Sequence, residues 1–146
     1  MVTDKKGMKM KKPVFNLLLT FMLLMSNVVF AADIFDTLDG LTTEQKRQMS
    51  NIYNNYKTKN NELLNQILSY TDKIAKLQSA ADKTQEQIAL LTGAYEKNIS
   101  TLKNQQEILS RETDALYKLI LTRLQYNQYQ SLQSNAQEAF NDFLQK

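Results

Sequence analysis

Apolar side chains recur at steps of three and four residues from residue 52 to residue 124 of this chain. The positions between them are mostly Lys, Glu, Asp, Asn, Gln, Ser and Thr. This spacing places the apolar residues on one face of an amphipathic α-helix, and near its middle it approaches the heptad pattern of a coiled coil. No proline interrupts the stretch, and Gly93 is its only glycine. The pattern therefore predicts an all-α protein built on long helices.

A helix start precedes this stretch, at Leu41-Thr-Thr-Glu-Gln45. Thr42 suits the N-cap position, because its hydroxyl can accept a hydrogen bond from the backbone N–H three residues later. Gln45 stands at that third position and can reach back to the N–H of Thr42, which completes a capping box. Glu44 adds a negative charge in the first turn, where the helix dipole favours it. We therefore predict that the first long helix begins at about Thr43.

The length of the periodic stretch raises the question of where the chain turns. A continuous helix would be roughly 110 Å long and could bury its apolar face only against partner chains, whereas a hairpin buries that face within one chain. The midpoint between Gln45 and Gln125 lies near residue 85, so a turn at 80–84 would bring the regions around these two glutamines together. We favour this turn, and with it an elongated antiparallel helical hairpin with short flanking helices. Asp82 or Thr84 would cap the return helix. Two other breaks are compatible with the pattern, at residues 69–72 and 92–93.

A second copy of the Leu-Thr-x-x-Gln motif stands at the end of the periodic stretch, at Leu121-Thr-Arg-Leu-Gln125. Two interpretations are open. Thr122 can cap a further helix through Gln125, or the preceding helix can continue through Tyr126, Tyr129 and Leu132, since no proline forces a break. Residues 116–121 are the most apolar part of the return helix, and we expect them to be its most buried part. A last helix is predicted over residues 134–144.

The first 31 residues have the three-part pattern of a secretory signal peptide. Basic residues at 9–12 precede an apolar run at 14–30, and small or branched side chains flank a cleavage site. We place cleavage after Ala31, with Ala32 as the second choice. The alternative is an uncleaved membrane anchor, but the run is at the short limit for spanning a bilayer and contains polar residues. The sequence thus predicts an exported protein.

The predicted organisation follows from these assignments: a signal peptide at 1–31, an N-terminal leader at 32–40 and a helical domain at 41–146. The leader shows little periodicity. Its apolar residues would be exposed unless they packed on the helical body, so we expect these residues to dock there: Ile34, Phe35 and Leu38.

Charge and composition narrow the possible functions. Five of the 18 basic residues, but only one of the 15 acidic residues, precede the apolar run, so the rest of the chain is close to neutral. It lacks the basic stripe that a phosphate backbone requires, and we expect no nucleic-acid partner. The chain has no Cys and no His, which excludes disulfides, thiol chemistry and imidazole catalysis. It also has no glycine-rich phosphate loop and no nucleophile paired with a base. We therefore expect no enzyme activity, no cofactor and no small-molecule substrate.

Tyrosine is the distinctive residue of the mature chain. Tyrosine tolerates a half-wet surface, because its hydroxyl stays solvated while its ring contacts apolar groups. Tyr53 and Tyr56 stand three residues apart on the first helix, as do Tyr126 and Tyr129 beside the second motif. A hairpin that turns near residue 82 would bring these two pairs together. Two interpretations are open: the tyrosines fill the hairpin core, or they line a surface for a client or partner protein.

Two Leu-Thr-x-x-Gln motifs, a signal peptide and a proline-free helical span between the motifs resemble the Spy/CpxP-type family. The residues that carry the likeness are Leu41, Thr42 and Gln45 in the first motif and Leu121, Thr122 and Gln125 in the second. The second copy differs from the family pattern, which usually has Pro-Glu where this chain has Arg123-Leu124.

The resemblance implies a helical hairpin, usually paired into a curved homodimer whose concave face holds unfolded proteins without ATP. Members of this family are periplasmic chaperones and envelope-stress adaptors. Some dampen a sensor kinase and others bind zinc. Zinc binding is not expected here, because carboxylates alone make poor zinc sites. The family's concave face is often basic, whereas this helical domain is nearly neutral.

The sequence therefore predicts an ATP-independent periplasmic chaperone or envelope-stress adaptor. Its expected partners are unfolded client proteins or a protein of the envelope. The alternative is a structural coiled-coil component of an envelope secretion or conjugation apparatus, because such subunits also begin with a signal peptide and continue as long, Gln-rich helices.

Overall fold

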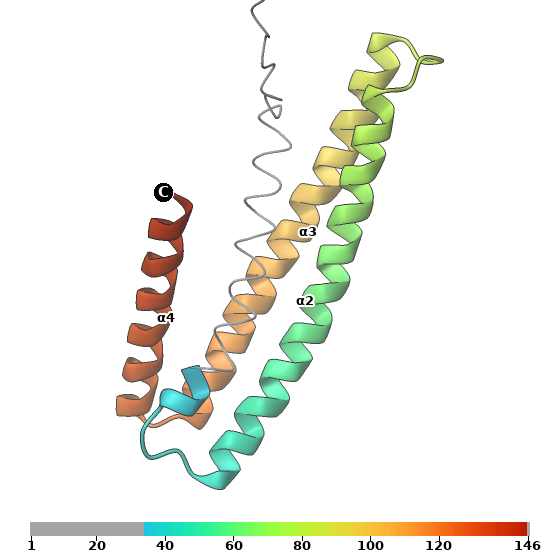
Figure 1. Ribbon diagram of the computed structural model, residues 1–146. Helices are drawn as coiled ribbons and strands as arrows, with labels where there is room; N and C mark the ends of the chain where they lie inside the picture. The colour runs from blue at the N-terminus through green and yellow to red at the C-terminus, as the bar shows by residue number, and fades with distance from the viewer. Residues whose placement is uncertain (1–33, 146) are drawn as a thin grey trace, which may run out of the picture.

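A computed structural model describes residues 34–145, and this part of the chain is all-α. Helices α2 (Thr43–Gln78) and α3 (Gln85–Ile120) form an elongated antiparallel hairpin. Helix α4 (Arg123–Leu144) starts at the open end of the hairpin and runs back beside it, separating from α3 toward its C-terminal end (Figure 1). The predicted signal peptide and its cleavage site lie outside the described residues. None of the described helices is long and apolar enough to cross a membrane.

The hairpin turns where the symmetry of the two motifs predicts. Helix α2 ends at Gln78, and Thr84 caps α3 with a complete capping box to Gln87. The two other candidate breaks, at 69–72 and 92–93, lie inside α2 and α3. Gly93 needs no special conformation there, because its φ angle is not positive. We call residues 77–87 the tip of the hairpin.

The end opposite the tip is built from the N-terminus of α2, the C-terminus of α3, the start of α4 and the leader; we call it the motif end. Residues 34–37 form one helical turn, and the predicted docking of the leader is confirmed. Ile34 and Leu38 are buried, and the ring of Phe35 lies edge-on to Tyr117 at a centroid distance of 5.4 Å. Gly40 then turns the chain into α2 with a φ of 69°, a conformation that glycine adopts without strain.

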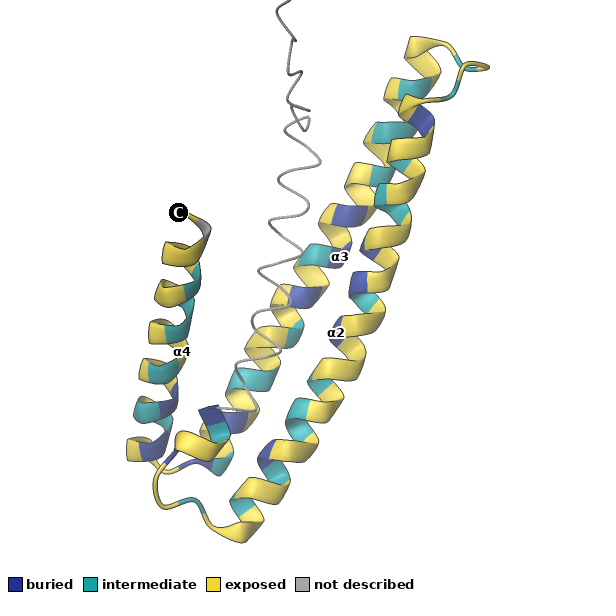
Figure 2. Ribbon diagram, viewed as in Figure 1, coloured by how far each residue is buried: buried dark blue, intermediate teal, exposed yellow. Residues whose placement is uncertain are grey.

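The core of the hairpin is divided into two clusters (Figure 2). The larger cluster occupies the motif end, and its buried members are Ile34, Leu38, Met49, Tyr117, Leu121 and Tyr129. The smaller cluster lies nearer the tip, and its buried members are Ile67, Ile99 and Leu102. Between them Asn60 and Gln106 are buried, and the Gln106 Nε2 donates to Asn60 Oδ1 over 2.9 Å. The Asn60 Nδ2 has no partner among the described residues. A polar layer therefore separates two apolar cores.

The expectation that residues 116–121 are the most buried part of α3 is wrong for half of them. Tyr117 and Leu121 are buried, but Leu116 is exposed and Leu119 is 82% exposed. A helix that packs on one side can bury only the residues of that face. The apolar residues at 116 and 119 lie outside it.

Helix α4 corrects the remaining prediction. The second motif could either begin a new helix or lie within a continuing one. It begins a new helix, because Thr122 and Gln125 form a complete capping box. The prediction of a separate last helix from residue 134 is wrong. Ser134 lies inside α4, which runs without a break from Arg123 to Leu144, since nothing in this stretch terminates a helix. Helix α4 is therefore one helix of 22 residues.

Candidate functional site

The described part of the chain contains three capping boxes with the same Thr-x-x-Gln spacing, at Thr42, Thr84 and Thr122. In each, the threonine hydroxyl accepts from the glutamine backbone N–H, and the glutamine side chain accepts from the threonine N–H. Two of the three lie at the motif end. We call residues 40–45 and 120–125, which contain these two boxes, the motif junction.

The glutamines of the motif junction also bind each other. The Gln45 Nε2 donates to Gln125 Oε1 over 3.0 Å and to the carbonyl of Ile120 over 3.0 Å. The Gln125 Nε2 donates to the carbonyl of Gly40 over 2.9 Å. Gln125 is buried. Each glutamine thus caps its own helix through its oxygen and ties a second segment through its nitrogen. Together they fix the leader, α2, α3 and α4 at one point.

Beside the motif junction lies a cluster of aromatic rings, which we call the tyrosine cluster: Phe35, Tyr53, Tyr56, Tyr117, Tyr126 and Tyr129. Tyr117 is its centre, because its ring lies edge-on both to Phe35 and to Tyr129, the latter at 5.2 Å. Tyr126 packs against Tyr129 at 6.2 Å, and its hydroxyl donates to Asp114 Oδ2 over 2.7 Å. The hydroxyl of Tyr129 accepts from the Gln133 Nε2.

Burial changes the acidity of these phenols. It raises the pKa of Tyr117 and of Tyr129 well above the usual value, with further raising from neighbouring tyrosines. Burial and the hydrogen bond to Asp114 raise the pKa of Tyr126 to about 12. Burial also raises the pKa of Tyr56. All four phenols are therefore neutral in ordinary buffers and can donate hydrogen bonds.

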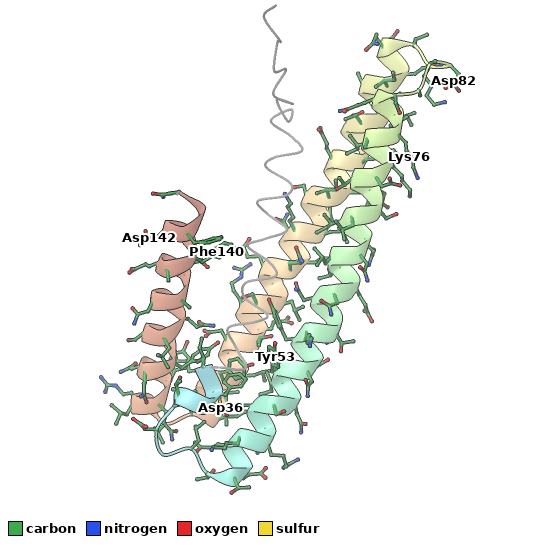
Figure 3. All side chains as sticks on the ribbon, in the orientation of Figure 1. Asp36, Tyr53, Lys76, Asp82, Phe140 and Asp142 are labelled. Atoms are coloured by element: carbon green, nitrogen blue, oxygen red, sulfur yellow. The ribbon has the colours of Figure 1, made fainter. Side chains whose placement is uncertain are left out.

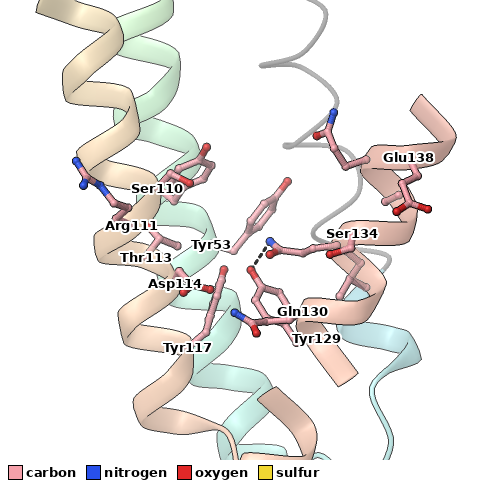
Figure 4. Close-up of a pocket in the computed structure, with 15 residues that line it drawn as sticks. Tyr53, Ser110, Arg111, Thr113, Asp114, Tyr117, Tyr129, Gln130, Ser134 and Glu138 are labelled. Carbon is pink, nitrogen blue, oxygen red and sulfur yellow. Dashed lines mark hydrogen bonds between the residues drawn. The ribbon is translucent and has the colours of Figure 1, made fainter. Parts of the chain in front are cut away.

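A cleft of about 670 Å³ opens above the tyrosine cluster, between the hairpin and α4 (Figure 4). Tyr53, Tyr117 and Tyr129 form its floor with their hydroxyls pointing into the space between the helices. Its walls carry mainly hydroxyl and amide side chains: Ser110, Thr113, Gln130, Gln133, Ser134 and Gln137. Such a cleft offers aromatic surface and many hydrogen-bonding groups but little net charge.

Among residues 34–145, three charged residues line the cleft: Arg111 and Asp114 from α3 and Glu138 from α4. None of them forms an ion pair with another described residue. Asp114 is half-buried, whereas Arg111 and Glu138 are exposed. No group of three or more acidic side chains within residues 34–145 is arranged to hold a metal ion.

The four tyrosines that are candidates for a client or partner surface lie partly in the core and partly in the cleft. Tyr53 and Tyr56 are half-buried and line the cleft, and Figure 3 shows Tyr53 at the motif end, far from Lys76 and Asp82 near the tip. Tyr129 is almost fully buried but reaches the cleft with its hydroxyl, and Tyr126 lies beside it and contacts Asp114. Both interpretations of these tyrosines therefore remain compatible with their positions.

Sequence reasoning missed two residues of this site, Tyr117 and Asp114. In the sequence, Tyr117 is one of several apolar positions in α3. Its central place in the cluster results from contacts with Phe35 of the leader and Tyr129 of α4. Asp114 lies four residues before Lys118, which is the spacing of an ordinary exposed ion pair. Its place in the cleft depends on where α4 packs, which no local pattern specifies.

A comparison with protein-family models finds no match, and comparisons with curated proteins and with solved structures find no significant similarity.

Proposed function

We propose that this protein is an ATP-independent chaperone or envelope-stress adaptor of the periplasm, which holds unfolded segments of client proteins in the cleft beside the motif junction. The proposal rests on the resemblance of its two motifs to the Spy/CpxP-type family and on one observation in particular. The cleft combines a tyrosine floor with walls of side-chain amides and hydroxyls.

This combination suits an unfolded polypeptide for a physical reason. Tyrosine rings contact apolar side chains of any shape, while their hydroxyls remain hydrogen-bonded. The amide and hydroxyl groups of the walls can bind the backbone N–H and C=O groups that an unfolded segment leaves unpaired. Contacts of this kind do not require one particular client sequence.

Aggregation suppression tests the proposal. Mature protein starting at Ala32 is added to an unfolding client without ATP, and light scattering is followed. We expect suppression near a stoichiometric ratio. Replacing Tyr53 and Tyr56 together by alanine should abolish it while the circular dichroism spectrum stays helical.

The chain offers a matched control for this double variant. Tyr70 and Tyr95 also form a ring pair across the hairpin, at 5.7 Å, but they lie near the tip and outside the cleft. Replacing both by alanine removes the same number of atoms and should leave suppression unchanged. Equal loss in both double variants would show that general destabilisation, rather than the cleft, is responsible.

The same experiment addresses the alternative function. A folded, helical protein that suppresses no aggregation would favour a structural component of an envelope apparatus, which would then be sought as a fixed complex. Localisation and assembly have their own tests. Intact-mass analysis of exported protein should show cleavage after Ala31, and sedimentation equilibrium should give a homodimer if the chain pairs as the resemblance implies.

A further inference from the structure

The cleft contains a tyrosine hydroxyl that is open to a bound ligand. Tyr117 is only 2% exposed, yet its hydroxyl has no hydrogen-bond partner among the described residues. Figure 4 shows this hydroxyl at the floor of the cleft, next to Asp114. The only buried side-chain polar atom without a partner in residues 34–145 is the Asn60 Nδ2, so the Tyr117 hydroxyl is accessible from the cleft, and a polar group bound there can hydrogen-bond to it.

The carboxylates of the cleft indicate that the bound polar group carries a positive charge. Asp114 accepts one hydrogen bond, from the Tyr126 hydroxyl to Oδ2, and its Oδ1 has no partner among the described residues. Glu138 lines the opposite wall, and neither carboxylate has a cationic partner within residues 34–145. A half-buried carboxylate is stabilised by a nearby positive charge.

The tyrosine rings add to this preference. The faces of aromatic rings carry partial negative charge and attract ammonium and guanidinium groups. The same molecule shows such a contact elsewhere: the Lys73 ammonium lies 4.8 Å from the centre of the Tyr70 ring and 5.8 Å from that of Tyr95. The cleft repeats the paired tyrosines and adds carboxylates. Within residues 34–145, the one cationic side chain that lines it is Arg111, which is exposed and pairs with neither carboxylate.

We propose that the cleft selects segments with a basic side chain, and that an arginine or lysine of an extended client polypeptide enters it between Asp114, Glu138 and the tyrosine floor. This inference rests on the proposed function and names the class of segment held. A guanidinium group has five donors and no acceptor, which matches the Oδ1 of Asp114 and the hydroxyl oxygen of Tyr117. The cleft is larger than one such group requires, and its amide-rich walls suit the flanking backbone.

Peptide binding tests the inference. Three labelled peptides share one neutral, flexible sequence and differ at a single central position, which is arginine, norleucine or glutamate. We expect fluorescence anisotropy to show the arginine peptide bound at least tenfold more tightly than the norleucine peptide, and the glutamate peptide bound most weakly. Equal binding of all three peptides would overturn the inference.

Asp114→Asn provides the decisive variant, because asparagine keeps an oxygen that can accept from Tyr126. It should weaken binding of the arginine peptide about tenfold and leave the norleucine peptide unchanged. Glu138→Gln should act in the same direction with a smaller factor. Glu112→Gln is the matched control, since Glu112 is exposed on the same helix but does not line this cleft, and it should change neither peptide. An equal loss for both peptides in Asp114→Asn would assign Asp114 a structural role and overturn the inference.

Two further outcomes separate the possible failures. If N-acetyl-arginine amide binds as tightly as the arginine peptide, the site takes a small organic cation, and the polypeptide proposal is overturned. If aggregation is suppressed but the three peptides bind alike, the chaperone proposal stands and the charge preference is wrong. Absence of both suppression and peptide binding overturns both.

Discussion

At the tip of the hairpin, Thr84 and Gln87 form a capping box that stabilises only the helix it begins. At the motif end, two boxes with the same residue spacing meet, and their glutamines bind each other and two backbone carbonyls of other segments. The local geometry is alike in all three. The difference lies in the surroundings, because Gln125 is buried among the ends of three helices, whereas Gln87 is exposed at the turn. One local motif therefore serves as a simple helix cap in one place and as a tertiary junction in another.

Replacing Gln125 at the motif end and Gln87 at the tip, one at a time, should give the largest difference in stability between the two ends. Gln125→Ala removes three hydrogen bonds of a buried side chain and leaves the Gly40 carbonyl and the Thr122 N–H without this partner, so we expect a loss of about 2–3 kcal/mol in the free energy of unfolding. Gln87→Ala removes only an exposed cap contact and should cost about 0.5 kcal/mol. Urea unfolding followed by circular dichroism measures both.

The threonines supply the control for this comparison. Thr84→Ala and Thr122→Ala each remove a similar N-cap hydroxyl, and each should cost about 1 kcal/mol. The two threonine variants should therefore lose similar amounts of unfolding free energy, whereas the two glutamine variants should lose different amounts. Equal costs for Gln125→Ala and Gln87→Ala would show that the junction adds nothing to the caps.

Alkaline pH should act on the motif end through its tyrosines. The pKa of Tyr117, Tyr126 and Tyr129 is raised in the folded state, above the value of about 10 for an unfolded chain. The unfolded state therefore loses these protons first, and the stability present below pH 10 is lost as the pH rises toward the folded-state values. Tyr117 and Tyr129 each contribute up to about 1.4 kcal/mol per pH unit in this window, and Tyr126 contributes less because solvent screens its interactions.

Urea unfolding at a series of pH values checks this dependence. Tyr126→Phe should flatten the decline between about pH 10 and pH 12, because it removes one of the titrating groups. A free energy of unfolding that does not change over this window would contradict the burial of these phenols.

Replacing the polar layer between the two apolar clusters should make the two ends of the hairpin unfold more cooperatively. Gln106→Leu alone leaves Asn60 with no buried partner and should cost about 1–2 kcal/mol. Replacing both residues by leucine removes the unmatched amides, joins the two clusters and should be neutral or stabilising. Hydrogen exchange should then show protection spreading between the clusters. A double variant that is less stable than either single variant would mean that the amide pair is itself stabilising.

Replacement by alanine should have opposite effects on the free energy of unfolding at Gly40 and at Gly93. Gly40→Ala forces a non-glycine residue into a positive φ and should cost about 1 kcal/mol, although a Cβ there would contact nothing within 4 Å. Gly93→Ala lies inside α3, also in open space, and should stabilise by about 0.5–1 kcal/mol. Thermal melts of the two variants give the comparison. A loss of stability for Gly93→Ala would indicate a contact of α3 that the single chain lacks.

The sequence by itself determined the features that depend on neighbours along the chain. The three and four residue spacing specified long amphipathic helices, and Thr42 and Gln45 specified the start of α2, because a capping box closes within one turn. The equal distance of the two motifs from residues 80–84 favoured a hairpin turn there over the two other breaks, since helices of equal length bury the most apolar surface when their ends align. The Thr122 box remained one of two alternatives, because its local pattern is equally compatible with a continuous helix.

Only the tertiary structure decided which faces are covered and which groups meet. It left Leu119 exposed and buried Tyr117, although both stand in one apolar run, because a single partner helix covers only one face. It also placed Asp114 beside the tyrosine cluster and joined Gln45 to Gln125 across 80 residues. These contacts depend on the direction in which α4 leaves the motif junction. That direction results from packing among the leader, α3 and α4 together, and no single segment of the sequence carries it.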